Sequence, residues 1–149
     1  MSGPGLIEQL AADAWFLQVL GDDTELRRIL GSGRVSRLVD DGRRTRGTPV
    51  LVAGHTAVVY SAQTPMRDVL GTGTTRIMAA GLYSVRAIGN PQQWATIKAA
   101  ARRADELLHG SMGAAEGAQV IAVAREETFQ FSDAKGYEIL GALYRVEVT

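Results

Sequence analysis

One long amphipathic helix between extended segments is the feature that most restricts how this chain can fold. Asn90 and Pro91 start this helix, because asparagine is a favoured N-cap and proline loses no hydrogen bond at the first helical position. Apolar residues recur at helical spacing as far as His109, and Gly110 ends the helix. The apolar stripe comprises Trp94, Ile97, Ala101, Ala104 and Leu108. Because the flanking segments are extended, we expect this stripe to pack on a sheet.

Two shorter helices are expected near the N-terminus. The segment Leu6–Leu20 keeps its apolar residues at helical spacing, and Gly21 follows as a stop. Asp22 and Asp23 can then cap a second helix over Thr24–Leu30. Two amphipathic helices therefore open the domain.

The next part of the chain is extended. Val50–Tyr60 is rich in β-branched residues and predicts a long strand with a bulge or bend at Gly54. Thr75–Ile88 predicts a second strand, kinked near Gly81. The two can pair as a hairpin whose tip, Gln63–Thr74, is longer than ordinary hairpin loops. Long tips of this kind are usually functional or disordered.

The remaining segments complete a sheet. Val120–Phe131 and Tyr137–Val148 predict two strands, and Ser132–Gly136 between them has the residues that a hairpin turn prefers. Arg34–Leu38 is compatible with one brief strand. The order of elements predicts a single domain over residues 1–149 of the α+β class, with an antiparallel sheet of about four strands packed against helices.

Composition agrees with a globular domain. The chain has 149 residues, of which 46% are hydrophobic, and its 16 basic residues balance its 16 acidic ones. This balance argues against a strongly basic nucleic-acid binder. Without cysteine there is no disulfide and no thiol nucleophile. No signal peptide or membrane-spanning run is recognisable, so we expect a soluble protein made in a cytoplasm.

No group of residues has the spacing of a known catalytic or metal site. His55 and His109 lie far apart, and none of the glycine-rich stretches has the pattern of a nucleotide-binding loop. Adjacent acidic residues point to different faces of a strand or helix, so they do not form catalytic pairs. Glu126 and Glu127 interrupt an apolar strand, which a bulge, a partner's arginine or simple exposure can explain. We therefore expect no enzyme activity, no metal and no cofactor.

An arginine cluster is the remaining candidate for binding. Arg43, Arg44 and Arg46 could contact phosphates or the acidic groups of a partner, since each offers a planar fork of donors. They could equally form a solvated loop balanced by Asp40 and Asp41. Both interpretations stay open.

The order of segments resembles a known family. The chain is similar to the tail-terminator, or tail-completion, proteins of siphophages, particularly those of actinobacterial phages. The resemblance runs from Leu6 to Val148 and rests on the order of the elements together with the ending EETFQF and LYRVEV. The segments that carry it are LAADAWFLQVLGD, GRVSRL, TPVLVAGHTAVVY, TTRIMAAGLYSVRAIG, NPQQWATIKAAARRADELLHG, EETFQF and GALYRVEV.

This resemblance implies a structural protein of the virion. Such proteins form a hexameric ring at the head-proximal end of the tail tube, where they stop polymerisation of the tube protein. The ring presents a surface to the stopper or adaptor proteins that complete the head. DNA passes through the ring without sequence-specific binding, and no membrane is involved.

Ring closure requires two different patches, one on each side of the subunit. The arginine loop and the Gln63–Thr74 tip are the candidates. The predicted interface residues are Arg43, Arg44, Arg46, Met66, Arg67 and Asp68.

Two alternatives remain. The protein could be a head–tail stopper or adaptor ring from the same part of the virion. From a different class, it could be a small ligand-binding α+β module, with an aromatic pocket built from Trp94, Phe129, Phe131 and Tyr144.

Overall fold

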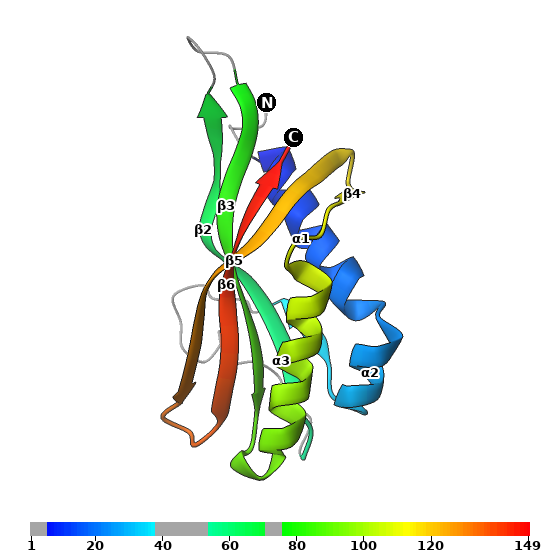
Figure 1. The fold of residues 1–149 in the computed structure, drawn as a ribbon, viewed down its shortest axis with the longest axis vertical. Coiled ribbons are helices and arrows are strands. Elements are labelled where there is room, and N and C mark those ends of the chain that lie inside the picture. Colours follow the sequence, from blue (N-terminus) through cyan, green and yellow to red (C-terminus); the bar gives the residue numbers. More distant parts are fainter. Residues whose placement is uncertain (1–5, 38–53, 71–75) are drawn as a thin grey trace.

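In the computed structural model, which describes residues 6–37, 54–70 and 76–149, three α-helices cover one face of a curled, six-stranded sheet (Figure 1). The fold is of the predicted α+β class. Each helix falls where the sequence places it. The helices are α1 (Leu6–Gly21), α2 (Thr24–Leu30) and α3 (Trp94–Leu108). The strands are β1 (Val35–Arg37), β2 (Ala57–Leu70), β3 (Arg76–Gly89), β4 (Gly113–Ala115), β5 (Ala118–Ser132) and β6 (Glu138–Val148).

The sheet is mixed and six-stranded, so the prediction of about four antiparallel strands is wrong. The strand order is β1-β2-β3-β6-β5-β4, and β1 pairs with β2 in parallel, whereas the other neighbours are antiparallel. Both edge strands have three residues, too few to show an alternating pattern. The chain turns from β4 into β5 at Glu116 and Gly117, which have φ angles of 50° and 78°. Positive φ at both central residues is typical of a tight hairpin turn.

Strand β2 ends later than predicted, and residues 50–53 of the predicted strand lie outside the described residues. Gly54 lies in a turn with φ of 76°, ahead of the strand and not inside it. The segment expected as a loop is instead paired with β3 as far as Leu70. Pro65 is accommodated because the register shifts between Thr64 and Arg67, which leaves the proline outside the regular ladder. Because this outer part of β2 is hydrogen-bonded to β3, the strand continues through polar residues.

The predicted helix starts are confirmed. Asp23 precedes α2, and its carboxylate accepts a hydrogen bond from the Leu26 backbone N–H at 2.8 Å. A short 3-10 turn over Pro91–Gln93 leads into α3, and the Gln93 side chain accepts from the Asn90 backbone N–H at 3.4 Å. Both starts follow from side chains that satisfy free backbone donors at a helix N-terminus.

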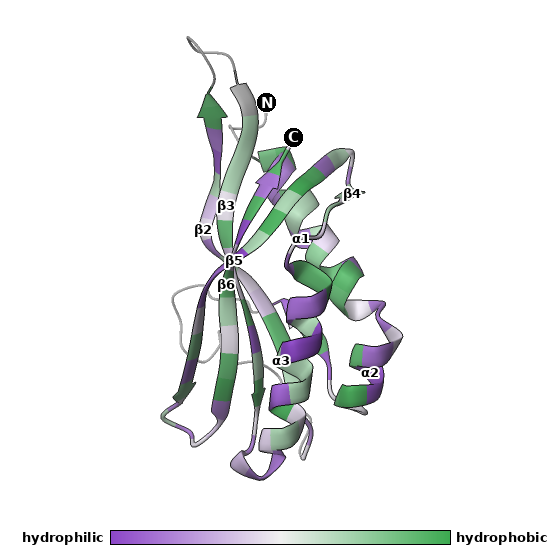
Figure 2. Ribbon diagram, in the orientation of Figure 1, coloured by the Kyte–Doolittle hydropathy of each residue, from purple (hydrophilic) through white to green (hydrophobic). Residues whose placement is uncertain are grey.

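The main core lies between the sheet and the helices. Phe16 of α1 stacks on Tyr83 of β3, with ring centroids 4.4 Å apart, and on Tyr60 of β2 at 5.9 Å. Ile97 and Leu108 of α3 are fully buried, as its apolar stripe predicts. Figure 2 shows α3 with alternating hydrophilic and hydrophobic turns, whereas α1 is mostly hydrophobic.

Candidate interaction surfaces

The β2–β3 arm projects beyond the end of the helices (Figure 1) and carries three of the predicted interface residues. Met66 is buried, with 5% of its surface exposed, and its backbone N–H donates to Gln9 of α1 at 3.0 Å. Arg67 is exposed and Asp68 is partly buried. Leu70, which the sequence analysis does not single out, is half-exposed. The arm therefore offers Arg67 and Leu70 to a partner, while Met66 fastens it to α1.

The arginine loop cannot be placed in the same way. Arg43, Arg44 and Arg46 lie outside the described residues. Their role at an interface stays a prediction.

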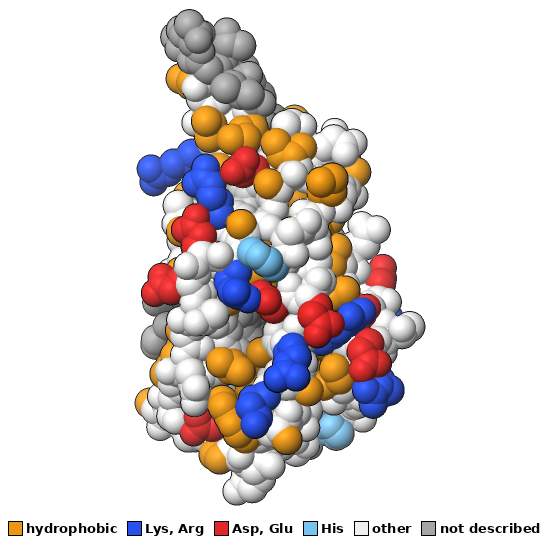
Figure 3. Space-filling view, viewed as in Figure 1, with side chains coloured by type: hydrophobic (Ala, Val, Ile, Leu, Met, Phe, Trp, Pro, Cys, Tyr) orange, Lys and Arg blue, Asp and Glu red, His pale blue; other side chains and the backbone are white. Residues whose placement is uncertain are grey.

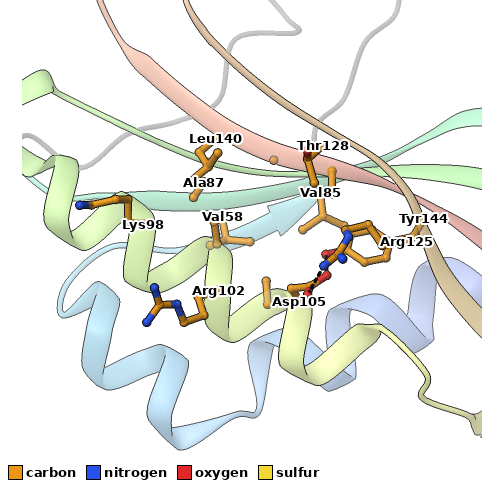
Figure 4. Close-up of a pocket in the computed structure, with 14 residues that line it drawn as sticks. Val58, Val85, Ala87, Lys98, Arg102, Asp105, Arg125, Thr128, Leu140 and Tyr144 are labelled. Atoms are coloured by element: carbon orange, nitrogen blue, oxygen red, sulfur yellow. Dashed lines mark hydrogen bonds and ion pairs between the residues drawn. The ribbon is translucent and has the colours of Figure 1, made fainter.

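A groove runs between α3 and the β5–β6 half of the sheet (Figure 4). Its volume is about 310 Å³. The floor is apolar, because the side chains of β2, β3 and β6 that face α3 are small or aliphatic, such as Val58, Val85 and Ala142. Lys98 and Arg102 of α3 line one side, and Thr128 of β5 lines the other.

One end of the groove is closed by a polar cluster. Asp105 of α3 accepts hydrogen bonds from the Tyr144 hydroxyl at 2.8 Å and from the Arg125 guanidinium at 2.5 Å. Burial and the bond to Asp105 raise the pKa of Tyr144 well above its usual range. The cluster ties α3 to both β5 and β6. It neutralises Arg125 but leaves the other two cations of the groove unaffected.

Those two cations are not held in ion pairs within the described part of the chain. Among the described residues, no carboxylate forms an ion pair with Lys98 or with Arg102. The sequence analysis singles out neither residue, and their i, i+4 spacing is the signal that could have grouped them. The floor could not have been found in this way, because it is assembled from three strands.

The two histidines lie next to α3 and β2. His109 follows α3, and its Nδ1 accepts from the Arg125 backbone N–H at 2.9 Å, which covers part of the β5 edge. His55 precedes β2 and does not lie within a strand. Within the described ranges, no three His, Asp or Glu side chains come close enough to hold a metal ion. None of the described helices is long and apolar enough to cross a lipid bilayer.

Of the three explanations for Glu126 and Glu127, the structure provides two. The register of β5 against β6 shifts between Arg125 and Glu127, and both glutamates are exposed. A bulge therefore breaks the alternation of this strand.

The four aromatic residues of the ligand-binding alternative do not line one pocket. Tyr144 lies on the helix-covered face and borders the groove. Phe129 lies on the opposite face, 5.9 Å from Phe131, and the Arg86 guanidinium stands 5.5 Å from the Phe129 ring centroid. Trp94 packs against the main core at the start of α3.

Comparison with known proteins gives matches in structure only. A scan against models of protein families finds no match, and neither does a search of the curated proteins. Among solved structures, a protein in the virion of a native gene transfer agent particle has a TM-score of 0.70 and 19% sequence identity. The match covers 93% of this chain and 94% of that protein. A second solved structure, whose name states no function, has a TM-score of 0.51 and 9% identity over 97% of this chain and 91% of its own. The fold is therefore shared with a virion protein over almost its whole length.

Proposed function

We propose that this protein is a structural component of a phage-like virion, and that it forms a ring at the head-proximal end of the tail tube. There it ends polymerisation of the tube protein and joins the tail to the stopper or adaptor proteins of the head. DNA passes through the ring without sequence-specific binding. The role requires no catalysis and no cofactor.

The observation that carries this proposal is the shared fold with the gene transfer agent virion protein. Gene transfer agents are phage-like particles. The likeness spans nearly all of both chains. Because fold alone does not define function, the position at the tail end rests on the resemblance in sequence to tail terminators.

The surface of the subunit supports a role in assembly. The arm formed by β2 and β3 exposes Arg67 and Leu70, and the groove beside α3 carries two cations that form no ion pair with a described carboxylate. A subunit of a ring needs two different patches of this kind. Opposite charges across such a contact fix the register of neighbours more than they add affinity.

Negative-stain electron microscopy tests the proposal. We expect purified protein to form six-fold rings with a central hole as its concentration rises, and to cap one end of purified tail tubes. Monomers at every concentration, together with tubes that remain uncapped, would contradict it. Rings that bind heads and not tubes would favour the stopper or adaptor alternative.

A further inference from the structure

Helix α1 carries large apolar side chains on both its inner and its outer face. Its inner face packs in the core through Trp15, Phe16 and Leu20. Its outer face exposes four large aliphatic side chains, each 46–55% exposed. They are Leu6, Ile7, Leu10 and Leu17. In a monomer this half of the helix surface faces water.

The spacing turns these residues into one continuous stripe. Leu6, Leu10, Ala14, Leu17 and Gly21 follow one another three or four positions apart, so they lie on one side of the helix. Asp13 borders the stripe between Leu10 and Leu17, where Arg37 and the Tyr83 hydroxyl bind its carboxylate. A contiguous exposed apolar surface marks an interaction site. Something in the assembled state must cover this face of α1.

Further apolar side chains are exposed in the segments that follow α3. Strands β4 and β5 pack beside α1; Met112, which directly precedes β4, and Ile121 of β5 are exposed. Figure 3 shows apolar side chains gathered over the upper part of the molecule, where α1 and β5 begin. Charged side chains dominate the lower part, around α3 and α2.

The groove on the other side of α3 has the matching properties. Its volume of about 310 Å³ is roughly twice the ~150 Å³ of an engineered apolar cavity that holds one benzene molecule. It can therefore receive two leucine side chains on its aliphatic floor. Helix α3 lies between this groove and α1 (Figures 1 and 4), so one chain cannot bring the two surfaces together.

The charges at the two surfaces are also complementary. Asp22 directly follows the stripe; it is exposed, and no described basic residue forms an ion pair with it. Lys98 and Arg102 border the groove, and no described carboxylate forms an ion pair with either of them. An apolar stripe followed by an acid without an ion pair thus corresponds to an apolar floor bordered by two cations without ion pairs.

We propose that the outer face of α1 in one copy of the chain docks into the α3–β5 groove of the next copy. The contact is head-to-tail, because it joins two different patches of identical subunits, and repetition of such a contact closes a ring or extends a filament. This inference rests on the proposed ring and supplies its subunit contact.

Cysteine cross-linking tests the contact, since the natural chain has no cysteine. Leu17→Cys places a thiol on the stripe and Ala101→Cys places one in the groove. After treatment with a short bifunctional thiol reagent, we expect the double variant to give a ladder from dimer to hexamer. Each single variant should give no cross-linked species, because its thiol faces a surface without a partner thiol. Absence of a ladder from the double variant up to millimolar protein would overturn the proposal.

The single variants add a second check. A dimer from Leu17→Cys alone would mean that α1 packs against α1 about a two-fold axis, which also contradicts a head-to-tail contact. If electron microscopy shows rings but the double variant gives no ladder, the contact is wrong and the proposed function stands. If neither rings nor a ladder form, the proposed ring loses its support as well.

Mixing two variants, each with one of the two surfaces disrupted, tests which surface binds which without a cross-linking reagent. The double variant Leu10→Glu/Leu17→Glu disrupts the apolar stripe. The double variant Lys98→Glu/Arg102→Glu reverses the charge at the border of the groove. We expect each variant alone to associate at least tenfold more weakly than the natural chain. Mixed together they should form heterodimers and nothing larger, because only one intact contact is possible. Ala134→Glu, on the exposed β5–β6 turn, is the control and should assemble normally.

Discussion

Asp23 and Arg103 form a two-point ion pair that fastens the start of α2 to the side of α3. The Arg103 Nε–Asp23 Oδ2 distance is 2.9 Å and the Nη2–Oδ1 distance is 2.8 Å. The same carboxylate accepts from the Leu26 backbone N–H, so one side chain caps a helix and fixes its position. Two parallel N–H···O bonds between a guanidinium and a carboxylate fix the orientation of the two groups relative to each other.

Replacing this carboxylate should destabilise the fold. For Asp23→Ala we expect the free energy of unfolding to fall by about 1–2 kcal/mol, the usual cost of a lost N-cap. Urea denaturation followed by circular dichroism measures it. Asp22→Ala is the matched control, because Asp22 neither caps α2 nor pairs with Arg103. Equal losses in the two variants would refute the role given to Asp23.

The same residue predicts a pH dependence. Arg103, followed by the bond from Leu26, holds the pKa of Asp23 below its ordinary value of 3.8. A lowered pKa in the folded state means that its stabilisation is complete above that value and is lost as the pH falls through the folded-state pKa. Between pH 5 and acid unfolding, stability should therefore fall less steeply in Asp23→Asn than in the natural chain. Equal slopes of stability against pH in the two proteins would contradict this.

Two tyrosines should resist ionisation. Burial and hydrogen bonds to Asp13 and Asp105 raise the pKa values of Tyr83 and Tyr144 above their ordinary value of 10.0. Because the folded protein keeps these protons longer than the unfolded chain, the stability they give is present below pH 10 and declines above it. Absorbance titration should show both hydroxyls ionising only as the protein unfolds. Tyr83→Phe and Tyr144→Phe identify which signal is which, and early ionisation of either would overturn the assignment.

Gly33 should tolerate no side chain. A Cβ atom at this position would lie 1.8 Å from the backbone oxygen of Thr56, which cannot move without disturbing the start of β2. For Gly33→Ala we expect a loss of about 2–3 kcal/mol, as for other overpacked sites. Gly21→Ala is the control, since its Cβ would meet only Leu17 at an ordinary 3.6 Å. A thermal shift assay compares the two, and an unchanged Gly33→Ala would contradict the close approach.

The arginine loop yields a prediction about assembly. Reversing the charge at Arg43, Arg44 and Arg46 should block assembly while leaving the monomer folded. Circular dichroism checks the fold, and electron microscopy of tails checks assembly. Normal termination of tails by the triple variant would show that these side chains are irrelevant to it.

The periodic elements of this fold could be predicted from sequence, because burial on one face imposes a repeat. Helix α3 and strand β6 show this most clearly. Strand β4 could not, since three residues give no repeat. A brief strand is expected over Arg34–Leu38, where β1 lies, but its parallel pairing with β2 depends on backbone contacts that the sequence does not show. The outer half of β2 looks like a loop because Gln63 and Pro65 are accommodated by register shifts that only the pairing with β3 reveals.

The candidate surfaces were harder to predict. Met66 looks like part of an exposed tip in the sequence, yet Gly81 leaves room for it to bury itself beneath the arm. The groove is assembled from α3 and four strands that lie far apart in the sequence. Sequence patterns report which residues share a face, but not how far apart two elements lie.

Tail length in virions made without this protein is the most direct test of its role at the tail end. Deleting the gene from the cells that produce the particle should yield overlong tubes without heads, and a copy supplied in trans should restore tails of uniform length. Tails of normal, uniform length that merely fail to join heads would contradict a terminator and identify a stopper or adaptor instead.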